Sequence, residues 1–112
     1  MLPIRYRLKK RKQFAYIYRQ GRKAGGAFVN VVYCGAGNSN SIKIGFTANK
    51  KVGNSVVRHR AVRLMRESVK PFLPLLKLNN YIFVAREGIT EQHLLYITID
   101  IEKTLKKAGL LK

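Results

Sequence analysis

The chain has 112 residues, of which 23 are Lys or Arg and 5 are Asp or Glu, so its formal net charge is +18. It has no apolar run near the length of a membrane span, no apolar segment behind its basic start to form a signal peptide, and a lone cysteine, Cys34, which excludes an internal disulfide. We therefore expect one cytoplasmic domain, residues 1–112, that binds a polyanion and not a membrane.

The positive charge is concentrated in the first part of the chain. Residues 1–66 carry 16 basic side chains and no acidic one, whereas the remaining 46 residues carry 7 basic and 5 acidic side chains. The electric field of so many like charges destabilises the free protein by self-repulsion and attracts nucleic acid. Nucleic acid is therefore the expected partner.

The first predicted helix covers residues 9–20 and ends at Gly21. Phe14, Ile17 and Tyr18 share one face of it. Phe14 and Tyr18 can fill the core, or they can stack on unpaired bases beside the basic run of residues 9–12. The pattern alone favours the core.

Three strands are predicted. Residues 27–34 and 41–48 surround a turn at residues 35–41, and we expect the two to form an antiparallel hairpin. Cys34 is expected to be a small buried strand residue and not a nucleophile. Residues 80–86 form the third strand.

A basic helix is predicted over residues 55–70, capped by Asn54 or Ser55, with Gly53 allowing close approach of the backbone. The apolar side chains fall on one arc, namely Val57, Ala61, Val62, Leu64, Met65 and Val69. The opposite arc carries His59, Arg60, Arg63, Arg66, Glu67 and Lys70. Neighbouring arginines repel one another, and cations near a helix N-terminus oppose the helix dipole, so this face predicts an anionic partner. The alternative is a basic helix that serves solubility alone.

Arg58 differs from the other arginines, because it lies on the apolar arc within the first turns. Its guanidinium is expected to emerge past the helix end or to line a cleft beside it.

The last helix is predicted over residues 90–108, ending at Gly109. Alternation of Ile97, Ile99 and Ile101 also fits a strand, but the apolar stripe extends over four turns and favours a helix.

Catalytic patterns are absent from the sequence. His59 and His93 lack metal-ligand spacing, there is no P-loop or GxSxG motif, and the five acids form no evident acid–base pair. We expect no bound metal and no catalysis by the chain alone.

Residues 50–67, KKVGNSVVRHRAVRLMRE, resemble the signature of the bacterial ribonuclease P protein component, Lys-Lys-x-Gly-Asn-Ala-Val-x-Arg-Asn-Arg-x-Lys-Arg-x-x-Arg. The segments LKKRKQFAYIYRQG and YIFVAR resemble the first helix and a later strand of the same family. The resemblance implies an α+β, two-layer fold in the order α-β-β-α-β-α, similar to domain 2 of ribosomal protein S5. It also implies a mixed sheet with a left-handed βαβ crossover, an exception to the usual rule.

The resemblance further implies a protein subunit that partners a catalytic RNA, which removes the 5′ leader of precursor tRNA with Mg²⁺ held mainly by the RNA. The residues implied to contact RNA are Lys50, Lys51, Asn54, Arg58, His59, Arg60, Arg63 and Arg66. The residues implied to line the cleft for the single-stranded leader are Phe14 and Tyr18, with Val32 or Tyr33 beside them.

Two positions depart from the family motif. His59 stands where the family has Asn, and Val62 stands where it has Lys. Val62 lies on the apolar arc, where a Lys would have to snorkel to reach solvent. Two other functions remain as alternatives, namely an RNA chaperone or ribosomal-type RNA-binding protein, and a self-sufficient nuclease.

Overall fold

The computed structural model describes residues 6–35 and 41–112. Within these residues it contains three α-helices, four strands and two 3-10 helices. In chain order these are α1 (Arg11–Gln20), β1 (Arg22–Ala24), β2 (Val29–Gly35), β3 (Lys43–Thr47), α2 (Ser55–Val69), η2 (Lys70–Leu75), β4 (Asn79–Ala85), η3 (Ile89–Glu91) and α3 (Leu94–Lys107).

All three predicted helices and all three predicted strands are present. The short strand β1 was not predicted, because three residues do not establish an alternating pattern. The predicted turn at residues 35–41 lies mainly outside the described residues.

The four strands form one mixed sheet in the order β1-β2-β4-β3. Strand β4 pairs antiparallel with β2 and parallel with β3. The predicted hairpin between residues 27–34 and 41–48 is therefore wrong, because β4 lies between these two strands. Tyr81, Ile82 and Phe83 of β4 are buried in succession, as expected for a central strand that is covered on both faces.

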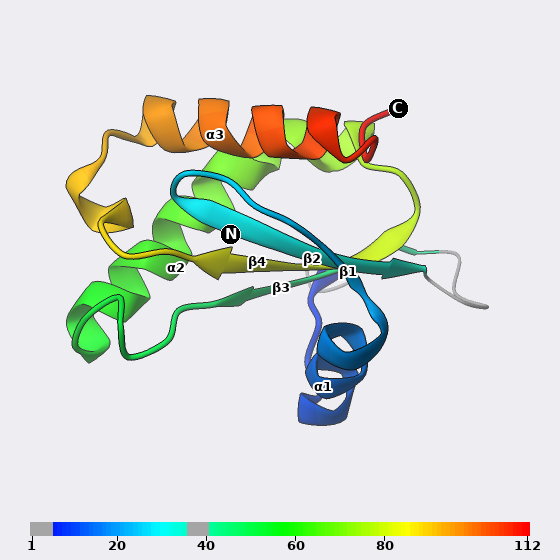
Figure 1. Cartoon of the computed structure of the whole chain (residues 1–112), viewed down its shortest axis with the longest axis horizontal. Coiled ribbons are helices and arrows are strands. Elements are labelled where there is room, and N and C mark those ends of the chain that lie inside the picture. Colours follow the sequence, from blue (N-terminus) through cyan, green and yellow to red (C-terminus); the bar gives the residue numbers. More distant parts are fainter. Residues whose placement is uncertain (1–5, 36–40) are drawn as a thin grey trace.

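Helices cover both faces of the sheet (Figure 1). Helices α2 and α3 pack on one face and enclose the larger core, which includes Met65, Phe83 and Ile101. Helix α1 lies alone on the other face, over a smaller cluster of Leu8, Ile17, Val32 and Ile82. Because one short helix cannot cover a whole sheet face, part of this second face stays open.

Helix α2 follows the predicted arcs. Ala61, Met65 and Val69 are buried, and Val62 packs against the same core. Asn54 is the N-cap, because its side-chain oxygen accepts a hydrogen bond from the Val57 N–H at 3.0 Å. The helix predicted over residues 90–108 is present as α3, but it begins at Leu94, after the separate 3-10 helix η3 and the N-cap His93. Gly109 follows its end with a positive φ of 72°.

Gly21 ends α1 for a reason of space. Its φ is −81°, which any residue can adopt. A Cβ at this position would clash with the Ile17 carbonyl oxygen and lie 2.8 Å from the Tyr33 carbonyl oxygen. Glycine therefore lets the chain leave α1 and enter the sheet directly as β1.

One carboxylate connects α3 to the loop between β1 and β2. Asp100 accepts hydrogen bonds from three consecutive backbone N–H groups, those of Ala27 at 2.8 Å, Phe28 at 2.9 Å and Val29 at 3.1 Å. Each charge-assisted bond of this kind is stronger than a neutral one. Asp100 thus holds residues that are more than 70 positions earlier in the chain.

We expect Asp100→Asn to lower the free energy of unfolding by about 1–3 kcal/mol, because an amide offers one acceptor oxygen and turns its NH₂ group toward the loop N–H donors. Glu102→Gln is the matched control, since it makes the same charge change on the same helix but removes only a surface ion pair with Lys106. Urea unfolding of the two variants provides the measurement. Equal loss of stability in both would show that the loop bonds add nothing.

Candidate nucleic-acid interface

The outward face of α2 carries a row of exposed basic side chains. His59, Arg60 and Arg63 are exposed, and Arg60 and Arg63 are three residues apart on adjoining turns. The one acid of α2, Glu67, forms an ion pair with Lys70 at 3.0 Å, and this contact lowers the pKa of Glu67. Glu67 lies on the same face, four residues after Arg63, but its carboxylate is paired with Lys70, which leaves the charge of Arg60 and Arg63 to attract an anion.

Arg66 is held differently from Arg60 and Arg63. It is half-buried, and its guanidinium carbon lies 5.9 Å from the centre of the Phe46 ring, within the range of a cation–π contact. Phe46 in turn stacks on Phe83 in the core, with 5.6 Å between ring centres. The sheet therefore fixes the position of the Arg66 charge before any partner binds.

Arg58 is also half-buried. Its Nε is inaccessible to solvent and makes no hydrogen bond to the part of the chain that the structure describes. A buried donor without an acceptor costs free energy. The separation of Arg58 from the exposed row agrees with its predicted place on the apolar arc.

The loop before α2 presents two further cations. Lys50 and Lys51 are exposed, and the loop is shaped by Asn49, whose side-chain oxygen accepts the Lys51 N–H at 3.0 Å. Gly53 has a φ of 150°, and a Cβ there would lie 2.8 Å from the Val57 side chain. Glycine is therefore required where the loop turns into the Asn54 cap.

Phe14, Tyr18 and Val32 come together on the open face of the sheet. The Phe14 ring lies over Gly45, because a Cβ on Gly45 would be 2.5 Å from two of its ring carbons. Tyr18 is 40% exposed, and its hydroxyl is 3.1 Å from Thr47 Oγ1. Phe14 is thus partly a packing residue, whereas Tyr18 is positioned with much of its ring accessible.

Tyr33 lies on the other face. Side chains alternate along β2, so Val32 joins the cluster under α1 while Tyr33 packs against the core under α2 and α3. Of the two residues that were predicted beside the cleft, the structure brings only Val32 to Phe14 and Tyr18.

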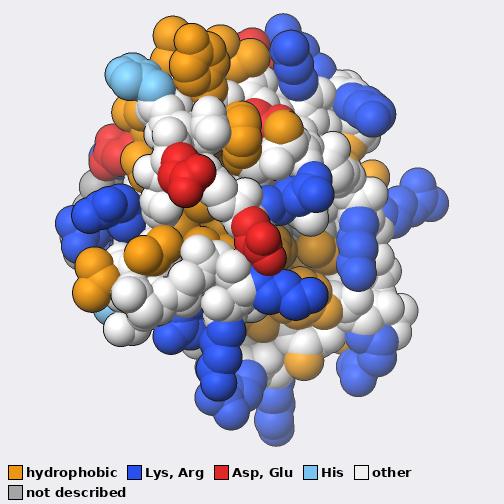
Figure 2. Space-filling model, turned by 60° about the vertical axis from the view of Figure 1, so that its left-hand side comes forward, with side chains coloured by type: hydrophobic (Ala, Val, Ile, Leu, Met, Phe, Trp, Pro, Cys, Tyr) orange, Lys and Arg blue, Asp and Glu red, His pale blue; other side chains and the backbone are white. Residues whose placement is uncertain are grey.

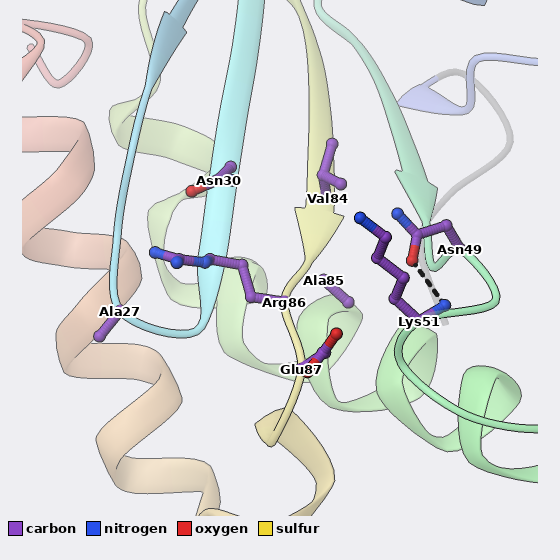
Figure 3. A pocket seen from close by; sticks show the side chains of 8 residues that line it. All are labelled: Ala27, Asn30, Asn49, Lys51, Val84, Ala85, Arg86 and Glu87. Carbon is purple, nitrogen blue, oxygen red and sulfur yellow. Dashed lines mark hydrogen bonds between the residues drawn. The ribbon is translucent and has the colours of Figure 1, made fainter.

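A hollow of about 230 Å³, here called the α1 groove, opens beside Tyr18. It is lined by Tyr18, Lys23, Ala24, Gly25, Asn30, Val32 and Val84. A second, more polar hollow of about 520 Å³ adjoins it and shares Asn30 and Val84 with it. We call this the polar cavity; Figure 3 shows Lys51 and Asn49 on one side of it and Arg86 and Asn30 on the other.

Sequence reasoning missed Lys23, Asn30, Val84 and Arg86. Lys23 belongs to the strand that was not predicted, and Arg86 follows the end of β4. Asn30 carried a usable signal, since a polar residue within an apolar strand marks a face that is not fully covered. The pairing of β2 with β4 was needed to place Asn30 beside Val84.

Hydrogen bonds fix the walls of the polar cavity. Arg86 donates from Nη1 to the Gly26 carbonyl oxygen, and Asn30 accepts the Gly26 N–H at 3.3 Å. The loop that contains Gly26 is the one that Asp100 holds from α3. Helix α3, on the opposite face of the sheet, therefore holds one wall of the polar cavity in place through this loop.

Charge is unevenly spread over the surface. Figure 2 shows Lys and Arg along the lower and right-hand parts of one view, with the acidic side chains nearer its upper and central parts.

Among the residues that the structure describes, no three His, Cys, Asp or Glu side chains gather to hold a metal ion. None of the described helices has the length and apolar character to cross a membrane.

The chain matches known proteins over nearly its whole length. A family model named Ribonuclease P matches residues 2–109. The ribonuclease P protein component of Gluconacetobacter diazotrophicus is 36% identical over 106 residues, covering 93% of this chain and 91% of that protein. That of Clostridium kluyveri is 33% identical over 110 residues, covering 96% and 97%.

Solved structures agree with these matches. The ribonuclease P protein of Staphylococcus aureus has a TM-score of 0.85 at 28% identity, covering 96% of this chain and 98% of that one. The protein from Thermotoga maritima, at 19% identity and a TM-score of 0.78, shares the fold and covers 90% and 96%. With a family model and relatives above 30% identity spanning the chain, this protein belongs to the family of bacterial ribonuclease P protein components.

Proposed function

We propose that this chain is the protein subunit of ribonuclease P, which binds the catalytic RNA and the single-stranded 5′ leader of precursor tRNA and so promotes leader removal. The observation that supports this most directly is that the α1 groove and the polar cavity share Asn30 and Val84 as lining residues. The two hollows therefore lie next to each other, with Tyr18 lining the first and Lys51, from the loop before α2, lining the second.

The α1 groove and the polar cavity suit two different parts of a nucleic acid. Tyr18 and Val32 offer a ring and an aliphatic floor on which unpaired bases can stack, and such contacts tolerate any sequence. Lys51 and Arg86 offer charge to the phosphates. The exposed arginines of α2 are then available for the catalytic RNA, which carries the Mg²⁺ and the chemistry.

An RNA chaperone or ribosomal-type protein is the second candidate. It is favoured by the basic face of α2, which by itself is suited to any structured RNA. The groove favours the first candidate, because a built surface for unpaired bases is unnecessary for binding a duplex through its phosphates.

Reconstitution tests the proposed function. Purified protein alone should leave precursor tRNA intact, and protein with its cognate RNA should remove the leader at Mg²⁺ concentrations where the RNA alone is slow. Gel analysis of the 5′ leader provides the measurement. Cleavage by the protein alone would overturn the proposal, and co-sedimentation with a ribosomal subunit without stimulation would favour the second candidate.

Arg63→Ala should reduce the salt dependence of binding to the catalytic RNA. Each phosphate contact releases counterions, so loss of one contact lowers the slope of log K against log salt by about 1. Lys107→Ala is the matched control, since it removes one exposed cation from a different helix, at the C-terminal end of α3. Equal slopes for Arg63→Ala and the unmodified protein would remove Arg63 from the interface.

Tyr18→Ala should weaken binding of precursor tRNA to the holoenzyme by about 1–3 kcal/mol while leaving mature tRNA nearly unaffected, because only the precursor has leader bases to stack. Tyr18→Phe is the control that keeps the ring and loses only the contact with Thr47. Binding of both tRNAs to the three proteins measures the effect. Equal losses for precursor and mature tRNA would assign Tyr18 to the core instead.

A further inference from the structure

A third hollow lies under α1, at the other end of the open sheet face from the polar cavity. It has a volume of about 210 Å³ and is lined by Leu8, Lys12, Gln13, Tyr16, Ile17 and Asn80. Asn80 is near the start of β4, whereas Val84 of the α1 groove is near its end. We call this hollow the outer hollow.

The outer hollow repeats the chemical make-up of the α1 groove. Each has one accessible tyrosine, one lysine, one asparagine from the sheet and an aliphatic floor, and their volumes are about 210 and 230 Å³. Tyr16 is 50% exposed, even more than Tyr18. The two tyrosines leave α1 in different directions, because residues two apart on a helix do not face one another.

The floor and rim of the outer hollow suit a planar, hydrogen-bonding ligand. Ile17 and Leu8 are buried and provide the apolar floor. Asn80 is half-buried, and none of the hydrogen bonds among the described residues uses its side-chain amide, which can both donate to and accept from the edge of a base. Gln13 is engaged differently, since its side-chain oxygen accepts the Lys10 N–H at 3.2 Å and closes the first turn of α1.

Charge selects the same class of ligand. Lys12 lines the hollow and belongs to a run of four exposed cations, residues 9–12, at and just before the start of α1. Residues 1–66 contain no acid. A planar aromatic ligand next to a run of cations is the pattern of an unpaired nucleotide, whose base stacks while its phosphate is neutralised. A neutral aromatic metabolite would leave these cations unused.

We propose that the outer hollow is a second binding site for an unpaired nucleotide, in which the base stacks on Tyr16 and hydrogen-bonds with Asn80 while Lys12 contacts its phosphate. The site extends the RNA-binding role proposed above and is separate from the α1 groove. The nucleotide belongs either to the leader or to an unpaired segment of the catalytic RNA, and both present the same chemistry.

The test compares Tyr16→Ala, Tyr16→Phe and Tyr96→Ala in the holoenzyme. Tyr96 is the matched control, because it is 59% exposed on α3 and its loss removes a similar ring from the other layer. Two affinities are measured, that of the protein for the catalytic RNA and that of the holoenzyme for precursor tRNA. Tyr16→Ala should weaken one of them by about 5- to 150-fold, the range for one stacked base. The affinities of Tyr16→Phe and Tyr96→Ala should stay close to those of the unmodified protein. Loss in protein–RNA assembly would assign the nucleotide to the catalytic RNA, and loss confined to precursor tRNA would assign it to the leader.

An unchanged affinity in both assays would overturn the second site, and so would equal losses for Tyr16→Ala and Tyr96→Ala. Photocrosslinking of the unmodified protein to a short 5-iodouridine oligoribonucleotide tests the site without a substitution, and it should label Tyr16 as well as Tyr18. Label on Tyr18 alone would remove the outer hollow while leaving the proposed function intact. Absence of label on both Tyr16 and Tyr18 would contradict both the outer hollow as a binding site and the proposed leader-binding function.

Discussion

The central position of β4 is the constraint on which the rest of the structure depends. Because β4 pairs with β2 on one side and β3 on the other, the end of β3 lies two strands away from the start of β2, with only Val84 and Ala85 of β4 between them. The loop after β3 carries Lys51, and β2 carries Asn30. Their meeting around one cavity therefore follows directly from the strand order, and a β2–β3 hairpin would have placed them differently.

The two faces of the sheet are covered to different extents, because β4 contributes side chains to a separate apolar cluster on each face. The larger cluster under α2 and α3 includes Tyr81 and Phe83 of β4, so that face is closed by packing. The opposite face has a cluster of four buried residues under α1 and leaves the sheet open on both sides of that helix. Stability and ligand access are thus assigned to different faces of one sheet.

Much of this was predictable from the sequence, because helical periodicity reports burial directly. The arc of Ala61, Met65 and Val69 and the presence of a last helix, predicted over residues 90–108 and found at Leu94–Lys107, follow from spacing. Residue type limited the N-cap of α2 to Asn54 or Ser55, and the structure has Asn54. Strand partners do not, since alternation shows which side of a strand is buried and not which strand lies next to it. The nearly continuous apolar run of β4 was the available sign that it is the central strand.

The candidate site shows the same limit. The basic motif is continuous in sequence, so its residues could be proposed as RNA contacts from their order. Lys23, Asn30 and Arg86 come from three separate segments, and only strand pairing brings Asn30 into a hollow with Lys23 and into the adjoining one with Arg86. Tyr33 and Val32 are adjacent in sequence and lie on opposite faces, so a one-residue difference decides which can reach the groove. Proximity in sequence is therefore a poor guide wherever the site is built on strands.

The two departures from the family motif have different physical weight. Val62 packs against the core, so it adds apolar contact on the buried side of α2 and removes a charge that would have had to bend outward. His59 is exposed beside Arg60, where its neutral ring can donate from one nitrogen and accept at the other, but these two groups do not lie side by side like the C=O and NH₂ of an amide. The charge left on the exposed face is therefore that of Arg60 and Arg63, with Arg66 held over Phe46 as a third cation. Compared with the family motif, this α2 surface has one cation fewer at residue 62 and a different hydrogen-bonding group at residue 59.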